Sequence, residues 1–381
     1  MDFAYSEEHE MIRQTARDFA EEVLAKTAAE RDRTESFFHE ELKQLAELGF
    51  LGIVVPEEYG GAGMDTISYM IALEELSCVD ASVGVVISVT NSLACYPILE
   101  FGTEAQKQKY LIPLAEGKYL GGFCLTEPES GSNAADLKTT AVFDGEHYVL
   151  NGSKNFITSG LSGDIFILTA VTDKSKGARG TTAFIIERDL EGIIFGAKEK
   201  KMGIRSSDTS SLTLDDCRIP VENRLGEEGM GFKIAMTSLD SGRLGIAAQA
   251  LGIAQAALEE SVKYSKERYQ FGRPISEFQA IQFKIADMEC RIQAARLLTY
   301  RAAYLKDQGK RYTKEAAIAK LCASETATWA ADEAVQIHGG YGYTKEFLVE
   351  RLFRDSRVTE IYEGTSEIMR LVISRAVLDE Y

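Results

Sequence analysis

Three kinds of sequence pattern follow one another along the 381-residue chain, and their order is the strongest constraint on its fold. Residues 1–120 have a helical pattern, residues 121–229 consist of short β-rich runs bounded by Gly, Asp and Ser, and residues 230–381 return to a helical pattern. Strands and helices do not alternate, which argues against a doubly wound parallel sheet. The order predicts an α+β chain of three domains with these limits: all-α, then β, then a helical bundle.

Apolar residues recur at helical intervals in both outer parts. Ile12, Ala16, Phe19 and Val23 are separated by four, three and four residues, which favours one apolar helix face. The same steps of four and three occur in the C-terminal part and predict a narrow bundle seam. The residues of this seam are Ile281, Ile285, Met288, Ile292, Ala295 and Thr299.

The central part has the alternation of half-buried strands. Leu212 and Leu214 alternate with Thr213 and Asp215, so the leucines are expected on the buried face. The dipeptide Asn151-Gly152 is the strongest local signal for a two-residue β-turn, and it predicts a hairpin at this point.

Charge and hydropathy exclude several classes of function. The formal net charge is −17, whereas binding to nucleic acid needs clustered Lys and Arg, so we expect no nucleic-acid partner. We find no apolar run long enough to span a bilayer, and the first residues have neither the basic nor the apolar region of a secretory signal. These features predict a cytoplasmic protein without membrane association.

The sequence lacks several common site motifs. Its six cysteines include no CxxC pair, which favours reduced thiols, and its four histidines lack the spacing of metal ligands, so no metal is expected. Its Gly-rich segments do not have the GxGxxG spacing, and neither GxxxxGK[ST] nor GxSxG occurs. A Rossmann site, a P-loop and an α/β-hydrolase triad are therefore poorly supported.

A candidate acid stands close to the C-terminus, in the segment IYEGTSEIMR at residues 361–370. Glu363 lies between Tyr362 and Gly364, just before a pattern typical of a helix start, with Thr365 or Ser366 as the N-cap. Taken alone, this pattern fits an ordinary acid that precedes a helix.

Four longer segments, in this order, resemble the flavin-dependent acyl-CoA dehydrogenase family. The resemblance extends over essentially the whole chain, and it implies an N-terminal helical domain, a central β-barrel and a C-terminal four-helix bundle. It also implies FAD as cofactor, an acyl-CoA thioester as substrate, an electron-transferring flavoprotein as electron acceptor, and a homotetramer. The segments are residues 121–139, 150–160, 265–282 and 336–368.

The resemblance gives Glu363 the role of catalytic base. In the family reaction a carboxylate removes the α-proton of the thioester while a hydride leaves the β-carbon for the flavin. Such a base needs a raised pKa in a dry, apolar setting, which Tyr362 and Ile361 would supply, and Gly364 would let the thioester approach. Some members carry the base at the position of Gly242, which has no ionisable side chain here, so Glu363 is expected to be the sole base.

The resemblance also assigns binding residues, each of which has a purely structural alternative as a turn or helix-end residue. Two positions depart from many relatives, because Phe156 replaces tryptophan and Glu367 replaces glutamine. Arg268, Phe271 and Gln279 would reach the FAD of a neighbouring subunit. Cofactor contacts are expected from Phe123, Leu125, Thr126, Ser132, Phe156, Thr158, Arg268, Phe271, Gln279, Gln336, Gly339, Gly340, Thr365 and Glu367. Substrate contacts are expected from Ser132, Asp240, Arg243, Tyr362 and Gly364.

The absence of a cationic side chain at one position limits the acyl groups that we expect as substrates. Gly84 stands where members that act on dicarboxylates carry a cation, so a dicarboxylate is not expected. The segment that follows it is most similar to short-chain, butyryl-type members. A 2-methyl-branched or cyclohexanecarboxyl thioester is an alternative, because one methylene changes binding in an apolar pocket by only about 1–3 kcal/mol. Two further alternatives are an oxidase and a non-catalytic acyl-CoA-binding scaffold.

Overall fold

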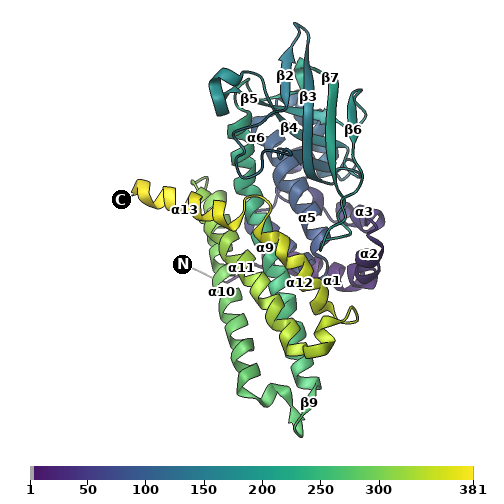
Figure 1. Ribbon diagram of the computed structural model, residues 1–381, viewed down its shortest axis with the longest axis vertical. Coiled ribbons are helices and arrows are strands. Elements are labelled where there is room, and N and C mark those ends of the chain that lie inside the picture. Colours follow the sequence, from purple (N-terminus) through teal and green to yellow (C-terminus); the bar gives the residue numbers. More distant parts are fainter. Residues whose placement is uncertain (1–3, 381) are drawn as a thin grey trace.

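Helices alone form the N-terminal part of the chain in the computed structural model, which describes residues 4–380 (Figure 1). The first helix begins where Ser6 and His9 form a capping box, and it buries Ile12, Ala16 and Phe19 as their spacing predicts. The helices are α1 (Glu7–Glu22), α2 (Ala28–Thr34), α3 (His39–Glu47), α4 (Thr66–Val79), α5 (Ala81–Val89), α6 (Tyr96–Phe101), α7 (Glu104–Gln106) and α8 (Ile112–Ala115).

One continuous helix runs through α5, a π-helical segment at Thr90–Cys95 and α6. It spans Ala81–Phe101, and its most apolar window has a mean hydropathy of 1.5. By length and composition this helix could cross a membrane, so the expectation that no apolar run is long enough was wrong. Within the molecule, however, 89% of that window is buried, because the helix packs in the core against α4 and α9 (Gly231–Glu267). Burial on all sides gives the same composition as a membrane span.

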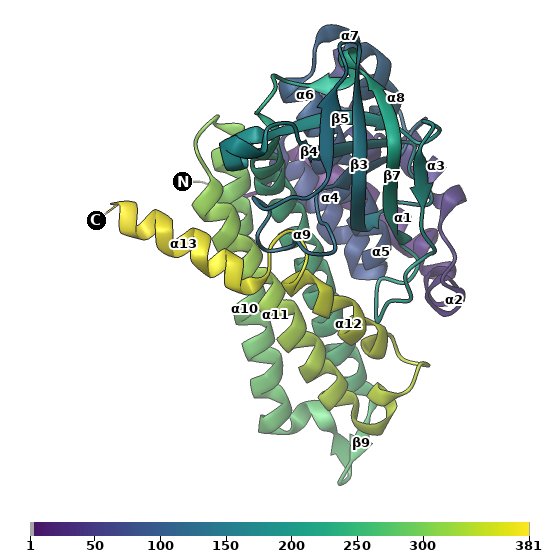
Figure 2. The ribbon, with the colours of Figure 1, turned by 45° about the horizontal axis from the view of Figure 1, so that its top comes forward.

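A curled sheet forms the middle of the chain (Figure 2). Its strand order is β6-β7-β3-β2-β4-β5-β8, β1 pairs in parallel with β4, and no pairing joins β6 to β8. Six of the strands contribute to one buried cluster, so the sheet curls around it as a partly open barrel. The strands are β1 (Gly121–Cys124), β2 (Thr140–Phe143), β3 (His147–Thr158), β4 (Ile165–Val171), β5 (Thr181–Glu187), β6 (Ile193–Phe195), β7 (Thr209–Pro220) and β8 (Arg224–Leu225).

The dipeptide Asn151-Gly152 does not form the predicted hairpin turn. Both residues lie inside β3, where the pairing with β7 shifts register between Leu150 and Gly152. Gly152 has a φ of +148°, and an added Cβ would lie 2.5 Å from Thr139 Oγ1, so a glycine is needed for a β-bulge at this point. The turn between β2 and β3 falls at Asp144 and Gly145 instead, where the Asp144 carboxylate accepts from two backbone N–H groups.

A bundle of long helices forms the C-terminal part (Figures 1 and 2). Helix α9 is buried without interruption from Ser241 to Ala254, and it packs against α4, α10 and α11. The predicted seam on α10 is buried from Met288 to Thr299, and it is half-buried at Ile281 and Ile285. The elements after α9 are β9 (Tyr269–Gln270), β10 (Arg273–Pro274), α10 (Gln279–Asp307), α11 (Thr313–His338), α12 (Leu348–Ser356) and α13 (Ser366–Glu380).

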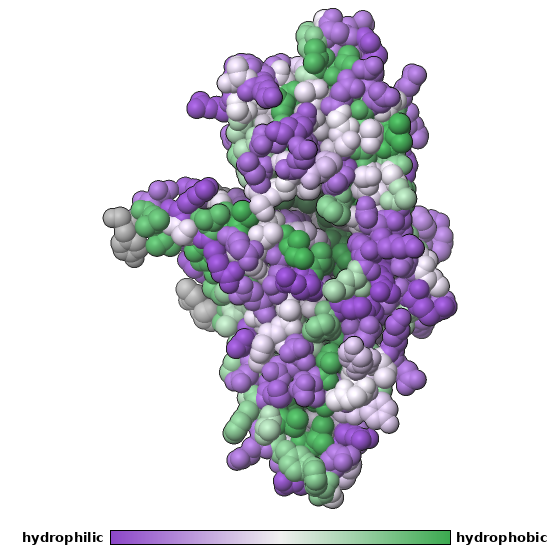
Figure 3. Space-filling model, viewed as in Figure 1, coloured by the Kyte–Doolittle hydropathy of each residue, from purple (hydrophilic) through white to green (hydrophobic). Residues whose placement is uncertain are grey.

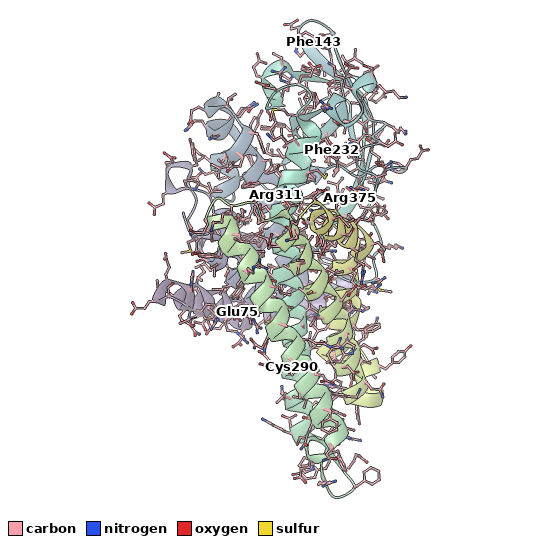
Figure 4. All side chains as sticks on the ribbon, turned by 90° about the vertical axis from the view of Figure 1, so that its left-hand side faces the viewer. Glu75, Phe143, Phe232, Cys290, Arg311 and Arg375 are labelled. Carbon is pink, nitrogen blue, oxygen red and sulfur yellow. The ribbon has the colours of Figure 1, made fainter. Side chains whose placement is uncertain are left out.

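Helix α13 leaves the bundle and projects from the body of the molecule (Figure 1). Apolar side chains gather on this projection and at the β9 end of the bundle (Figure 3), and they include Leu371 and Leu378 on α13 and Phe271 beside β9. Of the six cysteines, four are buried, and Cys290 is exposed on α10 (Figure 4). The proposed domain limits fall between α8 and β1 and between β8 and α9.

Candidate active site

Glu363 lies in the turn between α12 and α13, with its backbone in the left-handed region. Its φ is +54°, and the φ of Gly364 is +102°. A glutamate disfavours this conformation, whereas glycine accepts it. Such strain persists only where the surrounding structure holds it, and it is concentrated at functional sites. Two successive left-handed residues turn the chain sharply enough to direct the Glu363 side chain towards α9.

The carboxyl group of Glu363 occupies the space left by the missing side chain of Gly242 on α9. A Cβ at position 242 would lie 2.0 Å from Glu363 Oε2 and 2.8 Å from its Cδ. Glu363 as a whole is half-buried, but its Oε2 is inaccessible and has no hydrogen-bond partner among residues 4–380. The absent side chain at 242 is therefore what admits the carboxyl group to this position.

The environment of Glu363 favours the protonated acid. Burial raises its pKa to about 8, and the positive charges of Lys320 and Arg243 oppose this rise only in part. Neither cation forms an ion pair with the carboxyl group within residues 4–380. A carboxylate in this state can take up a proton close to neutral pH.

Three buried side chains hold the turn at three successive residues. The hydroxyl of Tyr362 bonds to the side-chain carbonyl of Gln249, Arg243 Nε donates to the backbone carbonyl of Glu363 over 3.4 Å, and Lys320 Nζ donates to the carbonyl of Gly364 over 2.8 Å. Arg243 is itself fixed by Asp240, whose Oδ1 lies 2.6 Å from Nη1. The structure thus brings together Glu363 and four of the predicted substrate residues: Asp240, Arg243, Tyr362 and Gly364.

A second group of predicted residues lies on the sheet, beside the same stretch of α9. Leu125 is buried in a cluster with Ala235, one to two turns before Gly242, and Phe123 packs on this cluster. The carbonyl of Thr126 accepts from the N–H of Asn155, which connects this segment to the end of β3. Phe156 is 67% exposed and Thr158 half-buried at that end, while Ser132 is exposed in the turn that follows Thr126.

An ion pair inside the sheet supports the segment around Thr126. Lys154 in β3 is fully buried, and its Nζ lies 2.7 Å from Glu127 Oε1 and 3.2 Å from the carbonyl oxygen of Leu125. The Glu127 carboxylate also accepts from the backbone N–H groups of Lys138 and Thr139. Burial alone would raise the pKa of Glu127, but the charge of Lys154 and these hydrogen bonds lower it.

A third group lies at the opposite end of the bundle from the sheet, around β9 (Figure 1). A cavity of about 530 Å³ there is lined by Arg268, His338, Gly339 and Gly340, among others. A methyl group added at Gly339 or Gly340 would meet no atom within 4 Å, so the backbone is open to a ligand. Phe271 is 93% exposed. Gln279 and Gln336 are also exposed.

Two predicted residues begin α13. Thr365 caps the helix, because its hydroxyl accepts from the N–H of Ile368 over 3.3 Å, and Glu367 is exposed in the first turn. One chain therefore does not bring all the predicted cofactor residues together. An open glycine-lined cavity with an arginine suits the diphosphate of a dinucleotide.

Sequence reasoning missed Lys320 on α11 and Gln249 on α9, two of the three side chains that hold the turn. Lys320 is preceded and followed by alanines at Ala316, Ala319 and Ala323, all of which are fully buried. A single lysine on an otherwise alanine-lined helix face is the signal that could have identified it.

Fold and site together describe an α+β chain in which a carboxyl group of raised pKa lies between α9 and the turn before α13. Family models for acyl-CoA dehydrogenase domains match the N-terminal domain at residues 6–118, the middle domain at residues 122–217 and the C-terminal domain at residues 229–378. The chain belongs to the acyl-CoA dehydrogenase family. The resemblance and the fold class stated from the sequence are thereby confirmed.

Three relatives illustrate how close this similarity is. The chain is 52% identical over 374 residues to "Acyl-CoA dehydrogenase, short-chain specific" of Clostridium acetobutylicum, covering 98% of this chain and 99% of that protein. It superposes with a TM-score of 0.98 on butyryl-CoA dehydrogenase from Megasphaera elsdenii, at 50% identity over 99% of this chain and 100% of the other. A structure described as electron transferring flavoprotein of Acidaminococcus fermentans also gives 0.98, at 53% identity and the same coverage.

Proposed function

We propose that this protein is an FAD-dependent dehydrogenase that converts a short-chain, butyryl-CoA-like thioester into the trans-2-enoyl-CoA. Electrons then pass to an electron-transferring flavoprotein. The observation that carries the proposal is the carboxyl group of Glu363, which lies over Gly242 with an unbonded, inaccessible Oε2 and a pKa raised to about 8. The short-chain relatives support the size of the acyl group.

The chemistry assigned to Glu363 follows from this setting. An α-hydrogen beside a thioester carbonyl is weakly acidic, so the base must be strong and shielded from water. As the proton moves to Glu363, the double bond forms between the α- and β-carbons. Bound FAD supplies the acceptor for the hydride that leaves the β-carbon. Within residues 4–380 no protein acceptor takes the N–H of Glu363, which leaves it available to the thioester oxygen as negative charge develops there.

Anaerobic mixing of the FAD-loaded protein with a panel of acyl-CoA thioesters tests this function. We expect the flavin absorbance to bleach fastest with butyryl-CoA. Faster bleaching with a 2-methyl-branched or cyclohexanecarboxyl thioester would favour the alternative substrates, and rapid peroxide formation in air would favour an oxidase. Tight binding of acyl-CoA without bleaching by any member of the panel would identify a non-catalytic scaffold.

Gly242→Ala tests the position of the carboxyl group. The new Cβ would lie 2.0 Å from Glu363 Oε2, so the carboxyl group must move by about 1 Å or more. A displacement of this size can lower a rate by about 10²-fold, and we expect that loss in the rate of anaerobic flavin reduction. An undiminished rate in Gly242→Ala would contradict this placement.

We also propose that the cofactor site is completed by a second copy of the chain. Support comes from the separation of the predicted residues. Arg268, Phe271 and Gln279 lie near β9, whereas Thr126 follows β1 and Thr158 ends β3. A homotetramer would bring the two ends of different chains together. Sedimentation velocity that shows a monomer with full FAD content would contradict the proposal. A cytoplasmic location is likewise proposed, because the relatives include bacterial proteins; others are named mitochondrial.

A further inference from the structure

We infer that Lys320 is a positioning residue for the base: it fixes the carbonyl of Gly364 and places a positive charge near Glu363 without contacting the carboxyl group. The inference rests on the proposed function, in which Glu363 is the base. Lys320 has no part in the chemistry given above, since it reaches the backbone of the turn rather than the side chain that accepts the proton.

Burying the ammonium group of Lys320 costs free energy, which indicates that this side chain has a specific role. Its exposed fraction is 0%, and it projects from the middle of α11 among Ala316, Ala319 and Ala323. No carboxylate of residues 4–380 lies within ion-pair distance of its Nζ, whose hydrogen bond goes to the carbonyl of Gly364 at 2.8 Å. A buried ammonium group without an ionic partner is strongly disfavoured, whereas an alanine or methionine would suit this helix face.

The hydrogen bond acts where the backbone is strained. Glu363 and Gly364 both have positive φ, and the Gly364 carbonyl is the first acceptor after the base. Arg243 holds the carbonyl of Glu363 from the other side, at the longer distance of 3.4 Å. Removing Lys320 would release the turn on the α11 side and leave a part-buried carbonyl without its donor.

The second effect of Lys320 is electrostatic, and it depends on the charged groups around Lys320 and Glu363. The amine faces Glu363 and Arg243 and, farther out, Glu360 and Glu367, while Tyr69 and Tyr362 also face the Glu363 carboxyl group. Burial lowers the pKa of Lys320 to about 8, and Glu363 opposes that change. In return, Lys320 and Arg243 keep the pKa of Glu363 below the value that burial alone would give.

Both cations therefore donate to backbone carbonyls and leave the carboxyl group free. A direct ion pair would occupy the oxygen that must take the proton, and it would lower the basicity of the carboxylate. A cation fixed one residue away instead favours the ionised base through space. Lys320 and Arg243 thus stabilise the charged form of Glu363 without a contact that would block its carboxylate oxygens.

The test compares Lys320→Met, Lys320→Gln and Lys320→Arg, with Lys314→Met as control. Lys314 lies on the same helix but pairs with Glu380 near the surface, over 2.5 Å. We expect Lys320→Met to lower the rate of anaerobic flavin reduction by butyryl-CoA about 10²-fold through displacement of the turn. Its rate should also rise with pH over a higher range than in the parent, because Glu363 loses a charge that lowers its pKa. Lys320→Gln should recover part of the rate of flavin reduction, but that rate should still rise over the higher pH range. In Lys320→Arg the rate should rise over the same pH range as in the parent.

A second readout needs no turnover. The folded pKa of Glu363 lies above its ordinary value, so the folded state binds more protons and the free energy of unfolding falls as pH rises through that interval. In Lys320→Met the fall should extend to higher pH than in Lys320→Arg, whose charge does not titrate in this range, measured by urea unfolding between pH 5 and about 9. If Lys320→Met does not fold, the Gln and Arg variants carry the same comparison.

Two results would overturn the inference. One is a Lys320→Met protein that has the rate and pH range of Lys314→Met. The other is a slower protein whose pH range moves downward, since a turn that merely opens to solvent lowers the pKa of Glu363. Failure of the parent protein to bleach with any thioester would refute the proposed function instead, and the unfolding series would still report on Lys320 and Glu363.

Discussion

Replacing Glu363 by Gln is expected to lower the rate of anaerobic flavin reduction by about 10²–10⁴-fold, the range that a general base contributes. Glutamine has the same size and fills the space over Gly242, but its amide cannot accept the α-proton. FAD should remain bound, because Glu363 is not among the expected cofactor contacts. Stopped-flow absorbance with butyryl-CoA measures the rate, and the flavin-to-protein absorbance ratio measures cofactor content.

Glu360→Gln is the matched control, since Glu360 lies three residues earlier and bonds to Arg357 at the same turn. It should reduce the flavin at close to the parent rate. In the parent, the rate should rise with pH as Glu363 ionises through a pKa near 8, because only the carboxylate can take the proton. An undiminished rate in Glu363→Gln would remove this residue from the mechanism.

Lys154→Met is expected to lower the free energy of unfolding by about 3–5 kcal/mol, the cost of removing one partner of a buried ion pair. The pair has side-chain exposures of 0% and 2%, so no water replaces the lost ammonium group. Glu127 would keep its charge in the interior, and the carbonyl of Leu125 would lose a donor. The segment around Thr126 should loosen, and FAD should dissociate more readily. Urea unfolding and fluorescence titration with FAD measure the two effects.

The stability lost in Lys154→Met should depend on pH in a definite direction. The pKa of Glu127 is lowered in the parent, so its contribution to stability exists above the ordinary carboxyl pKa and is lost as pH falls. Without Lys154, burial should raise the Glu127 pKa, so the variant should recover stability on acidification. The difference in the free energy of unfolding between the parent and Lys154→Met should therefore become smaller towards pH 4. Lys138→Met, which breaks a surface pair with Asp136, should change stability by less than about 1 kcal/mol. An equal loss in both variants would contradict the role of the buried pair.

Periodicity predicted the architecture well where burial has a regular period. Leu212 and Leu214 are buried while Thr213 is exposed, and the α10 seam faces the bundle from Met288 onward. It failed at Asn151-Gly152, because the same dipeptide that favours a hairpin turn also suits a bulge inside a long strand. Which of the two forms depends on the pairing of β3 with β7, a contact more than fifty residues away in sequence. Local propensity does not contain that information.

The candidate site was harder to predict from the residues alone than the fold. Local sequence left Glu363 as an ordinary acid before a helix, and only its resemblance to a family suggested a base. Its raised pKa comes from contacts with α9 and α11, more than forty residues earlier in the chain, so no window around residue 363 could reveal it. Lys320 differs in this respect, since a lysine among alanines at helical spacing is visible in the sequence. The roles of the individual binding residues stay predictions.

The left-handed backbone of Glu363 has a consequence for the durability of the whole protein. Strain and an unfavourable ionisation are both concentrated at the one residue that turnover needs, and both oppose folding. Glutamine keeps the backbone strain but cannot ionise, so an inactive Glu363→Gln protein should resist heat better than its parent, by a margin that widens from pH 4.5 to about 8. Screening for thermal tolerance alone would select against activity at this position.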